Sequence, residues 1–329
     1  MSKSLIDRLR SWDSKMVGNH GKISLNIRNS RNLRSNTVHL KNAITGMLPN
    51  TSDKLGLDLT GKKVAVALPC FNEAPALPQV INEWRKALPE AEILVFDNNS
   101  TDGSGAIAEG LGVRVVPVMR QGKGFVVRTM FTELADYDAV IMADGDGTYP
   151  ANAVFLLLEP VLNGQADMSV GARVPVAEMG AMSPVRGFGN ILIRAAFVVV
   201  MGISGGDMLS GYRVFGPKFL KGVRLKSKGF EIETEIVCQA LAGGYKVLEK
   251  PVSYLPRVAG TESKLRAVRD GLRIFKMMFI QSLRLKPWRI PGAVIGLVVA
   301  LALLTGSGLL WIAAGTAIGG LMVLNRKQP

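Results

Sequence analysis

This chain of 329 residues contains only two histidines and two cysteines. Both histidines, His20 and His39, precede residue 40, so the rest of the chain has none. Their absence excludes Ser-His-Asp and Cys-His nucleophilic machinery and histidine-bound zinc from the body of the protein. Cys70 and Cys238 are too few for a disulfide framework, which indicates a reducing compartment. Chemistry must therefore rely on carboxylates, amides, hydroxyls, Lys and Arg, with a hard metal ion as the further option.

Two common nucleotide-binding motifs are also missing. No G-x-G-x-x-G follows the first predicted strand, and none of the Gly-Lys pairs at 21–22, 61–62 and 122–123 precedes Ser or Thr. These absences argue against a dinucleotide site of the Rossmann type and against a P-loop. With 48% hydrophobic and 20% charged residues, the composition also excludes a disordered, collagen-like or disulfide-rich chain.

The net charge of +14 is concentrated in two segments. Residues 1–63 hold 12 Lys/Arg against 4 Asp/Glu, and residues 257–289 hold 9 against 2, whereas the body between them is close to neutral. Such flanking basic segments favour an anionic partner surface, either lipid or nucleic acid.

The C-terminal part of the chain favours lipid over nucleic acid. Ile290–Leu324 contains no charged residue and is longer than one bilayer crossing of about 20 residues. Thr305–Gly308 offers a turn near its middle, and basic residues flank both ends. The positive-inside rule then predicts a two-helix transmembrane hairpin with both ends in the cytoplasm. One long tilted helix, or a hairpin buried in a core, is the alternative.

The segment before this run carries two stripes at helical spacing. The apolar stripe consists of Leu265, Val268, Leu272, Phe275 and Phe279. The basic stripe beside it consists of Arg266, Arg269, Arg273 and Lys276. This pattern predicts a helix that lies in the headgroup plane of anionic lipid. An ordinary amphipathic surface helix is the alternative.

From residue 64 the chain alternates short apolar runs with helical stretches. We predict strands buried on both faces at 64–68, 92–97, 113–118 and 139–144. The helices predicted between them cover residues 76–88, 102–110 and 124–135. Such alternation predicts βαβ units and an α/β fold with a mostly parallel sheet. Ligands of such sheets bind beyond the carboxyl ends of the strands.

Polar residues gather at these strand ends. Pro69–Glu73 follows the first strand, Asp97–Asp102 the second, and Asp144-Gly145-Asp146 the fourth. Two carboxylates separated by one glycine suit Mg²⁺ or Mn²⁺ that also holds substrate phosphates. The alternative is a solvated turn in which an aspartate caps the next helix.

Taken in order, these motifs resemble those of a known family. Pro69–Glu73, Phe96–Gly103, Asp144-Gly145-Asp146 and, further on, Asp207–Arg213 and Arg257–Lys264 are similar to motifs of inverting family 2 glycosyltransferases with the GT-A fold. They resemble the polyprenyl-phosphate branch, typified by dolichyl-phosphate mannose synthase and bacterial undecaprenyl-phosphate sugar transferases. The resemblance covers about residues 62–270.

The resemblance implies roles for individual residues. Asp144, Gly145 and Asp146 would hold the metal, Mg²⁺ or Mn²⁺, and the sugar nucleotide. Arg173, Arg257 and Lys264 would meet phosphate charge during catalysis, and Arg186 with Asn190 would grip the lipid phosphate. The remaining residues assigned to nucleotide binding are Pro69, Phe71, Glu73, Phe96, Asp97, Asn98 and Lys123.

Some positions depart from the mannose synthases. Asn98 stands where they carry an aspartate, Asn190 replaces a serine, and Thr148 replaces a glutamine that helps to ligate the metal. The mannose synthases also lack Lys123. The resemblance therefore leaves the sugar and the base, UDP- or GDP-linked, open.

The reaction implied is an inverting, metal-dependent transfer of a sugar from a nucleotide sugar to polyprenyl phosphate. A lipid phosphate is already anionic near neutral pH, so this reaction requires no histidine base. One alternative is a polysaccharide synthase-like enzyme that extends a glycan, although Gln281–Arg284 is followed by Leu285 rather than by the Trp of the Q-x-x-R-W motif. The other is a non-catalytic membrane adaptor, which the intact Asp144 and Asp146 disfavour.

We therefore expect four parts. Residues 1–61 form a basic N-terminal extension, and residues 62–256 form the GT-A catalytic domain. Residues 257–289 form a basic membrane-surface segment, and residues 290–325 form the transmembrane hairpin. The protein is expected at a membrane with its catalytic domain in the cytoplasm, binding no nucleic acid; a homo-oligomer is compatible with this organisation.

Overall fold

The structure is a computed structural model that describes residues 57, 59–175, 193, 197–198, 206–262, 264 and 267–285. The predicted hairpin at 290–325, nearly all of the N-terminal extension, and Arg186 and Asn190 lie outside these residues. Among the helices that are described, none is both long enough and apolar enough to cross a membrane.

A seven-stranded sheet forms the centre of the described chain, in the order β3-β2-β1-β4-β6-β5-β7. β6 runs antiparallel to β4 and β5, and every other neighbouring pair is parallel, which confirms the predicted mostly parallel α/β sheet. The strands are β1 (Val64–Cys70), β2 (Glu92–Asp97), β3 (Arg114–Pro117), β4 (Ala139–Met142), β5 (Met168–Pro175), β6 (Arg213–Phe215) and β7 (Val247–Tyr254).

Helices connect and cover these strands. They are α3 (Leu77–Ala87), α4 (Ser104–Gly110), α5 (Lys123–Glu133), α6 (Val154–Leu162), α8 (Pro217–Gly222), α9 (Ile232–Ala242), α10 (Ala267–Leu285) and the 3₁₀ turn η1 (Ala151–Ala153). The predicted helices 76–88, 102–110 and 124–135 match α3, α4 and α5 to within two residues at each end. The fourth predicted strand is shorter than expected, because β4 ends at Met142 and leaves Asp144 in the following loop.

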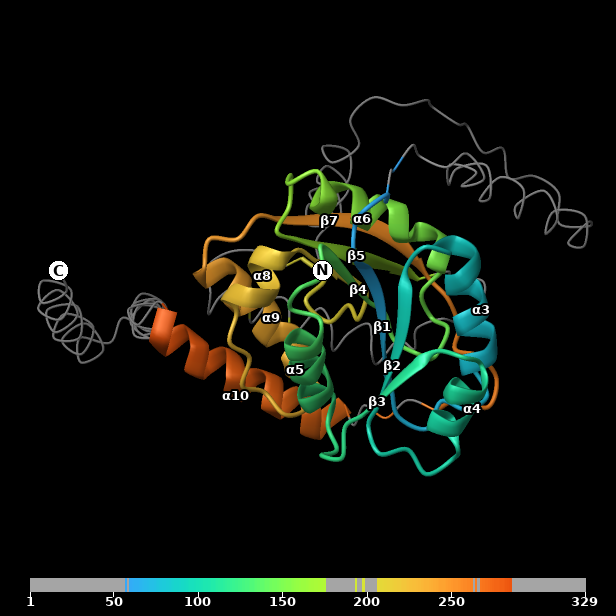
Figure 1. Cartoon of the computed structure of the whole chain (residues 1–329). Coiled ribbons are helices and arrows are strands. Elements are labelled where there is room, and N and C mark those ends of the chain that lie inside the picture. Colours follow the sequence, from blue (N-terminus) through green and yellow to red (C-terminus); the bar gives the residue numbers. More distant parts are fainter. Residues whose placement is uncertain are drawn as a thin grey trace, which may run out of the picture. The chain divides into compact units, whose positions relative to one another are not determined.

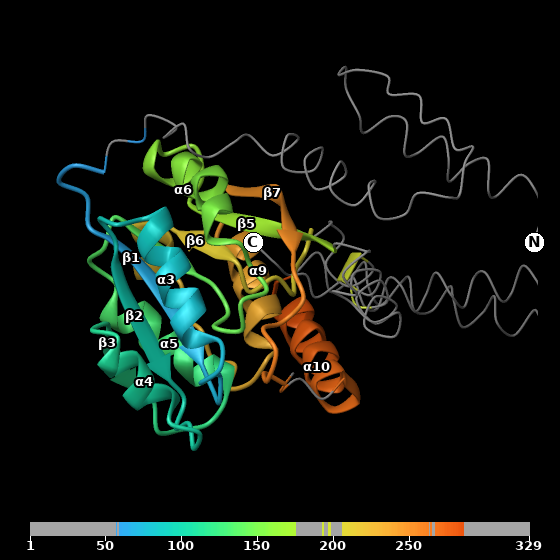
Figure 2. The same ribbon diagram turned by 90° about the vertical axis from the view of Figure 1, so that its right-hand side faces the viewer.

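The alternation of side chains along β1 divides the core into two layers. Val66 and Leu68 pack with α3 and α6 on one face, and Ala65 and Ala67 pack with α5, α8 and α9 on the other. Figures 1 and 2 show the strands between these two groups of helices. β3 departs from the prediction of burial on both faces. It is an edge strand whose Arg114 is exposed, because only β2 pairs with it.

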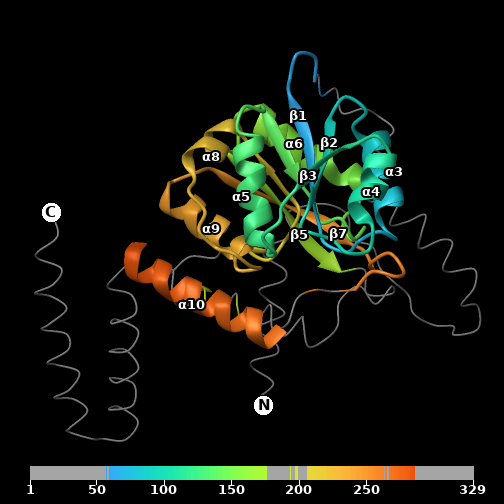
Figure 3. The same cartoon turned by 60° about the horizontal axis from the view of Figure 1, so that its bottom comes forward.

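Helix α10 packs against α9 at one side of the described domain (Figure 3). Its buried residues Ile274 and Met278 contact a small apolar cluster that includes Cys238 of α9. The predicted apolar stripe is only partly buried there: Phe275 packs against this cluster, whereas Leu272 is 66% exposed and Phe279 is 48% exposed. α10 thus buries one apolar face and leaves another open.

Candidate active site

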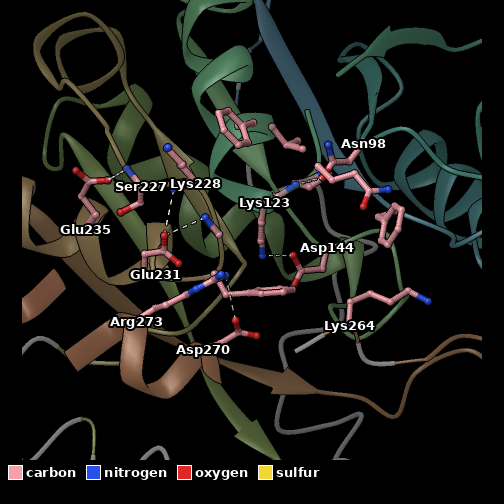
Figure 4. A pocket seen from close by; sticks show the side chains of 18 of the residues that line it. Asn98, Lys123, Asp144, Ser227, Lys228, Glu231, Glu235, Lys264, Asp270 and Arg273 are labelled. Carbon is pink, nitrogen blue, oxygen red and sulfur yellow. Dashed lines mark hydrogen bonds and ion pairs between the residues drawn. The ribbon is translucent and has the colours of Figure 1, made fainter. Parts of the chain in front are cut away.

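A cavity of about 860 Å³ lies at the carboxyl ends of β1 and β4. It brings together most residues that the sequence assigned to the site, although they are spread over nearly 200 positions. Figure 4 shows this cavity, with Asp144 and Lys123 near its centre and Asn98 to one side. The predicted residues that line it are Pro69, Phe71, Glu73, Asn98, Lys123, Asp144, Gly145, Asp146, Arg257 and Lys264.

Asp146 is a buried carboxylate with two sets of partners. Its Oδ1 accepts hydrogen bonds from the backbone N–H (3.0 Å) and the hydroxyl (2.6 Å) of Thr148. Its Oδ2 lies 2.5 Å from Nη1 of Arg257. Only 2% of Asp146 is exposed, so it is not part of a solvated turn. Burial, followed by the charge of Asp144, raises the pKa of Asp146.

The backbone fixes Arg257 opposite Asp146. The N–H groups of Leu255 and Val258 donate to the carbonyl oxygens of Thr148 (2.9 Å) and Asp146 (3.1 Å), which ties the two loops together. Gly147 makes this close approach possible: its φ is +77°, and a Cβ there would lie 2.7 Å from Val258. The glycine after the paired aspartates therefore positions the arginine.

Asp144 belongs to a chain of alternating charges. Nζ of Lys123 lies 2.6 Å from Oδ1 of Asp144 and 2.7 Å from Oε1 of Glu233. The other oxygen of Glu233 lies 3.2 Å from Nε of Arg213, which is fully buried. Burial alone would raise the pKa of Asp144, but the Lys123 ammonium outweighs it and the pKa is lowered. Asp144 is therefore held in its ionised form.

Arg213 extends this network into the segment that precedes β6. Its guanidinium donates to the carbonyl oxygens of Met208 (2.8 Å), Ser210 (3.0 Å) and Glu233 (3.1 Å). Gly211, two residues before Arg213, lies so close to Asp144 that a Cβ at this position would collide with the carboxylate. Any side chain at Gly211 would therefore displace Asp144.

Glu73 is the third carboxyl group at the centre of the cavity. Its Oε1 lies 3.9 Å from Nη1 of Arg257, and its buried Oε2 has no hydrogen-bond partner among the residues that the structure describes. Burial, reinforced by the charge of Asp146, raises the pKa of Glu73 to about 7. Glu73 and Asp146 thus share Arg257, and Asp144 shares Lys123 with Glu233.

Asn98 shapes the wall of the cavity. Its amide donates to the carbonyl oxygens of Val118 (3.0 Å) and Arg120 (2.7 Å) and accepts from the N–H of Gly122 (2.7 Å). These bonds hold the loop between β3 and α5. Asn98 is 5% exposed, and its amide group is engaged mainly in these structural hydrogen bonds.

Three predicted site residues do not line the cavity. Phe96 is fully buried on the sheet face covered by α5, and Asp97 accepts a hydrogen bond from the N–H of Ser100 (3.2 Å). Arg173 forms a two-pronged ion pair with Asp207, with N···O distances of 2.7 Å each. Because side chains alternate along β2, Phe96 lies on the core face of the sheet. The ion pair directs the guanidinium of Arg173 toward the carboxylate of Asp207. Arg186 and Asn190 lie outside the described residues.

The paired aspartates fit a divalent cation. No cluster of three or more Asp, Glu, His or Cys that could hold a metal occurs within the described residues, so protein ligands would number two. Mg²⁺ is commonly held by one or two carboxylates together with substrate phosphates and water. Burial, followed by repulsion from Asp144, raises the pKa of Asp146, and a cation held by the two carboxylates would offset that repulsion. Thr148, by contrast, is engaged with Asp146.

The sequence interpretation missed the loop at 226–231 and the role of Glu233. This loop lines the cavity and packs against the start of α5, where Gly124 donates to the carbonyl oxygen of Lys228 (3.1 Å). A Cβ on Gly122 or Gly124 would collide with the backbone of this loop. The Gly-Lys-Gly sequence was the available signal: the glycines allow the contact and the lysine reaches Asp144.

Comparisons with known proteins agree with this geometry. A family model described as "Glycosyl transferase family 2" matches residues 65–186. Glycosyltransferase AglJ of Haloferax volcanii is 36% identical over 220 residues, covering 67% of this chain and 72% of that protein. Polyprenol monophosphomannose synthase of Mycolicibacterium smegmatis is 27% identical over 248 residues, covering 70% and 88%.

A solved structure shares the fold. Glucosyl-3-phosphoglycerate synthase from Mycobacterium tuberculosis, in complex with Mn²⁺, UDP-glucose and phosphoglyceric acid, aligns with a TM-score of 0.52 at 18% identity. The alignment covers 69% of this chain and 80% of that one. The sheet and its flanking helices thus have the GT-A arrangement. The chain belongs to glycosyltransferase family 2, and it is a glycosyltransferase.

Proposed function

We propose that this enzyme transfers a sugar from a UDP- or GDP-linked donor to a polyprenyl phosphate, with inversion at the anomeric carbon. The observation that carries the proposal is that the cavity around Asp144 and Asp146 extends to α10, a helix that also exposes Leu272 and Phe279. Such an arrangement suits a substrate with an anionic head and an apolar tail. The similarity to a polyprenol monophosphomannose synthase supports this choice of acceptor.

The described residues supply binding and positioning for this reaction. The phosphate oxygen of the acceptor forms a bond to the anomeric carbon as the bond from that carbon to the diphosphate breaks, and the nucleoside diphosphate leaves with the electron pair. The acceptor phosphate is an anionic nucleophile, so no side chain has to remove a proton. Arg257 and Lys264, which line the cavity, neutralise charge on the leaving group.

A divalent cation, Mg²⁺ or Mn²⁺, completes the site in this proposal. Asp144 and Asp146 would hold it, and its chemistry when bound is to neutralise and orient the diphosphate. Lys123 and Glu233 keep Asp144 in place, and Arg257 is the counter-ion of Asp146 in the metal-free protein.

The proposed acceptor requires a membrane. We therefore place the catalytic domain on the cytoplasmic side of a bilayer, anchored by the predicted hairpin at 290–325. Both native cysteines are buried, so one cysteine introduced at exposed Lys86 reports the side on which the domain lies. A membrane-impermeant maleimide should label Lys86→Cys in inside-out vesicles and not in intact cells. The opposite pattern would contradict the topology.

The reaction itself is tested with purified full-length protein and a panel of nucleotide sugars. Radiolabel should pass from one donor to the organic phase only when polyprenyl phosphate is present, and EDTA should abolish the transfer. Asp146→Asn should lower it at least ~100-fold, whereas the matched surface variant Asp136→Asn, at a side chain that is 89% exposed, should retain it. Label that enters a water-soluble glycan instead would identify a polysaccharide-extending enzyme and overturn the proposal.

A further inference from the structure

The active-site cavity has a second part beyond the paired aspartates. In Figure 4, Lys228, Glu231, Asp270 and Arg273 lie on the opposite side of the Lys123–Asp144 pair from Asn98. The loop at 226–231 and α10 form this part, which we call the α10 lobe. The residues that define it are Lys226, Lys228, Phe230, Lys276, Met277 and Ile280.

The carboxylates of the lobe contact backbone N–H groups or arginines, although Oε2 of Glu231 is buried without a hydrogen-bond partner among the described residues. Glu235 accepts hydrogen bonds from the N–H groups of Lys226 (3.0 Å) and Ser227 (2.7 Å). Oε1 of Glu231 accepts from the N–H groups of Lys228 (3.2 Å) and Gly229 (3.1 Å). The third carboxylate, on α10, lies within 3.6 Å of two arginines of the same helix.

These contacts leave positive charge at the cavity. Among the described residues, no carboxylate forms an ion pair with the side chain of Lys226, Lys228 or Lys276. All three lysines line the same space as the apolar side chains of Phe230 and Ile280. The lobe therefore combines unpaired cations with an apolar wall, which matches a phosphate that carries a hydrocarbon chain.

The geometry of α10 connects this lobe to the exposed apolar face. Because a helix turns by about 100° per residue, residues at different positions of α10 point in different directions. Three faces of this helix can be distinguished. Ile274 and Met278 are buried against α9, and Met277 and Ile280 line the cavity. Leu272 and Phe279 form the third, exposed face.

Lys276 lies where two of these faces meet. It is one turn from both Leu272 and Ile280, so a hydrocarbon chain that leaves the lobe over Ile280 reaches the exposed apolar face by passing along Lys276.

We propose that the α10 lobe binds the head of the acceptor, with its phosphate at Lys228 and Lys276 and its first isoprene units against Met277 and Ile280. This inference rests on the proposed function and assigns the acceptor to residues that the family resemblance did not include. The diphosphate of the donor is the other phosphate that these lysines could meet. The apolar wall favours the acceptor, because a nucleotide sugar has no hydrocarbon chain.

The test compares Lys276→Gln with Lys86→Gln, a matched change at an exposed helical lysine that does not line the cavity. Full-length protein in lipid nanodiscs is assayed with undecaprenyl phosphate and its nucleotide sugar. Lys276→Gln should raise the KM for the lipid phosphate about tenfold, the scale of one charge-assisted contact, and leave the KM for the donor within twofold. Lys86→Gln should leave both constants unchanged.

A second variant separates the apolar wall from the charge. Ile280→Ser should raise the KM for undecaprenyl phosphate but not that for butyl phosphate, which lacks isoprene units. A rise in both, or in neither, would overturn the assignment of the wall. Because Ile280 is 39% exposed, this substitution leaves the core intact, and a thermal-shift measurement verifies the fold.

The remaining outcomes are distinct. If Lys276→Gln raises the KM for the donor as much as that for the acceptor, the lobe holds the diphosphate and the proposal is wrong. If Lys276→Gln behaves like Lys86→Gln, the lysines are merely solvated and the proposal is also wrong. If the wild-type enzyme transfers no sugar to any polyprenyl phosphate, the proposed function fails and this assignment fails with it.

Discussion

The buried carboxyl group of Glu73 should make the metal-free enzyme less stable as the pH rises. Glu73 is 7% exposed, and its pKa is raised from an ordinary 4.5 to about 7, by burial first and by Asp146 second. Between these two values the folded protein keeps a proton that the unfolded chain has released. Stability therefore falls as the pH rises through this window, and the full penalty is present above pH 7.

The size of the penalty follows from the two pKa values. Because one pKa unit corresponds to 1.36 kcal/mol, ionised Glu73 costs about 3 kcal/mol of folding free energy at pH 8. Glu73→Gln keeps the volume and removes the charge. It should raise the Tm in EDTA at pH 8 by about 6–12 °C, given about 2–4 °C per kcal/mol for a domain of this size. The gain should shrink toward zero near pH 4.5.

Thermal unfolding in EDTA across this pH range measures the effect, with Glu90→Gln as the matched change at an exposed glutamate. Mn²⁺ with nucleoside diphosphate should reduce the advantage of Glu73→Gln, because a cation at the paired aspartates offsets the repulsion that Glu73 experiences. Equal Tm values for the wild type and Glu73→Gln at pH 8 would refute the reasoning. So would a stabilisation that is the same at pH 8 and at pH 5.

Four further predictions concern the same site. Asp146→Asn should lower turnover at least ~100-fold and abolish Mn²⁺ binding detected by electron paramagnetic resonance, and full activity in EDTA would contradict the metal assignment. Arg257→Gln should lower the Kd for Mn²⁺ in the absence of donor, because the competing guanidinium is removed, yet raise the KM for the nucleotide sugar. If this Kd and this KM changed in the same direction, the result would be inconsistent with this role. Glu233→Gln should weaken Mn²⁺ binding several-fold, because Lys123 then neutralises Asp144 more fully. An unchanged Mn²⁺ affinity in calorimetry would mean that Glu233 only supports the fold. Gly124→Ala should lower the Tm by the equivalent of about 1–3 kcal/mol through its collision with the 226–231 loop, whereas Gly110→Ala, which has open space, should not.

The sequence predicted the catalytic half of the fold well because its signals are local. Alternating apolar runs and helical stretches placed β1, β2, α3, α4 and α5 to within about two residues. The rule that ligands lie beyond the carboxyl ends of parallel strands then brought Glu73, Asp144 and Asp146 to one edge of the sheet, as the structure has them.

Contacts between distant segments could not be predicted in the same way. Arg173 was assigned to phosphate, but it pairs with Asp207, 34 residues further along the chain. Lys123 was assigned to the nucleotide, and the structure shows it between Asp144 and Glu233, a residue 110 positions away. An isolated arginine or lysine in a sequence carries no record of which carboxylate it meets, because that choice depends on how the strands are ordered.

For the same reason, the sequence of α10 predicted its contact with lipid but not the face that it buries against α9. Its spacing revealed one apolar and one basic stripe and predicted contact with lipid on that basis. A helix with a single partner needs only one apolar face, yet α10 has Ile274 and Met278 on one face and Leu272 and Phe279 on another. Packing against α9 accounts for the first face. The second remains exposed in the described chain, on the helix that also lines the cavity with Asp144 and Asp146. In the proposed reaction the acceptor stays in the bilayer while its phosphate reacts, and a helix with a core face, a cavity face and an open apolar face suits both ends of that acceptor.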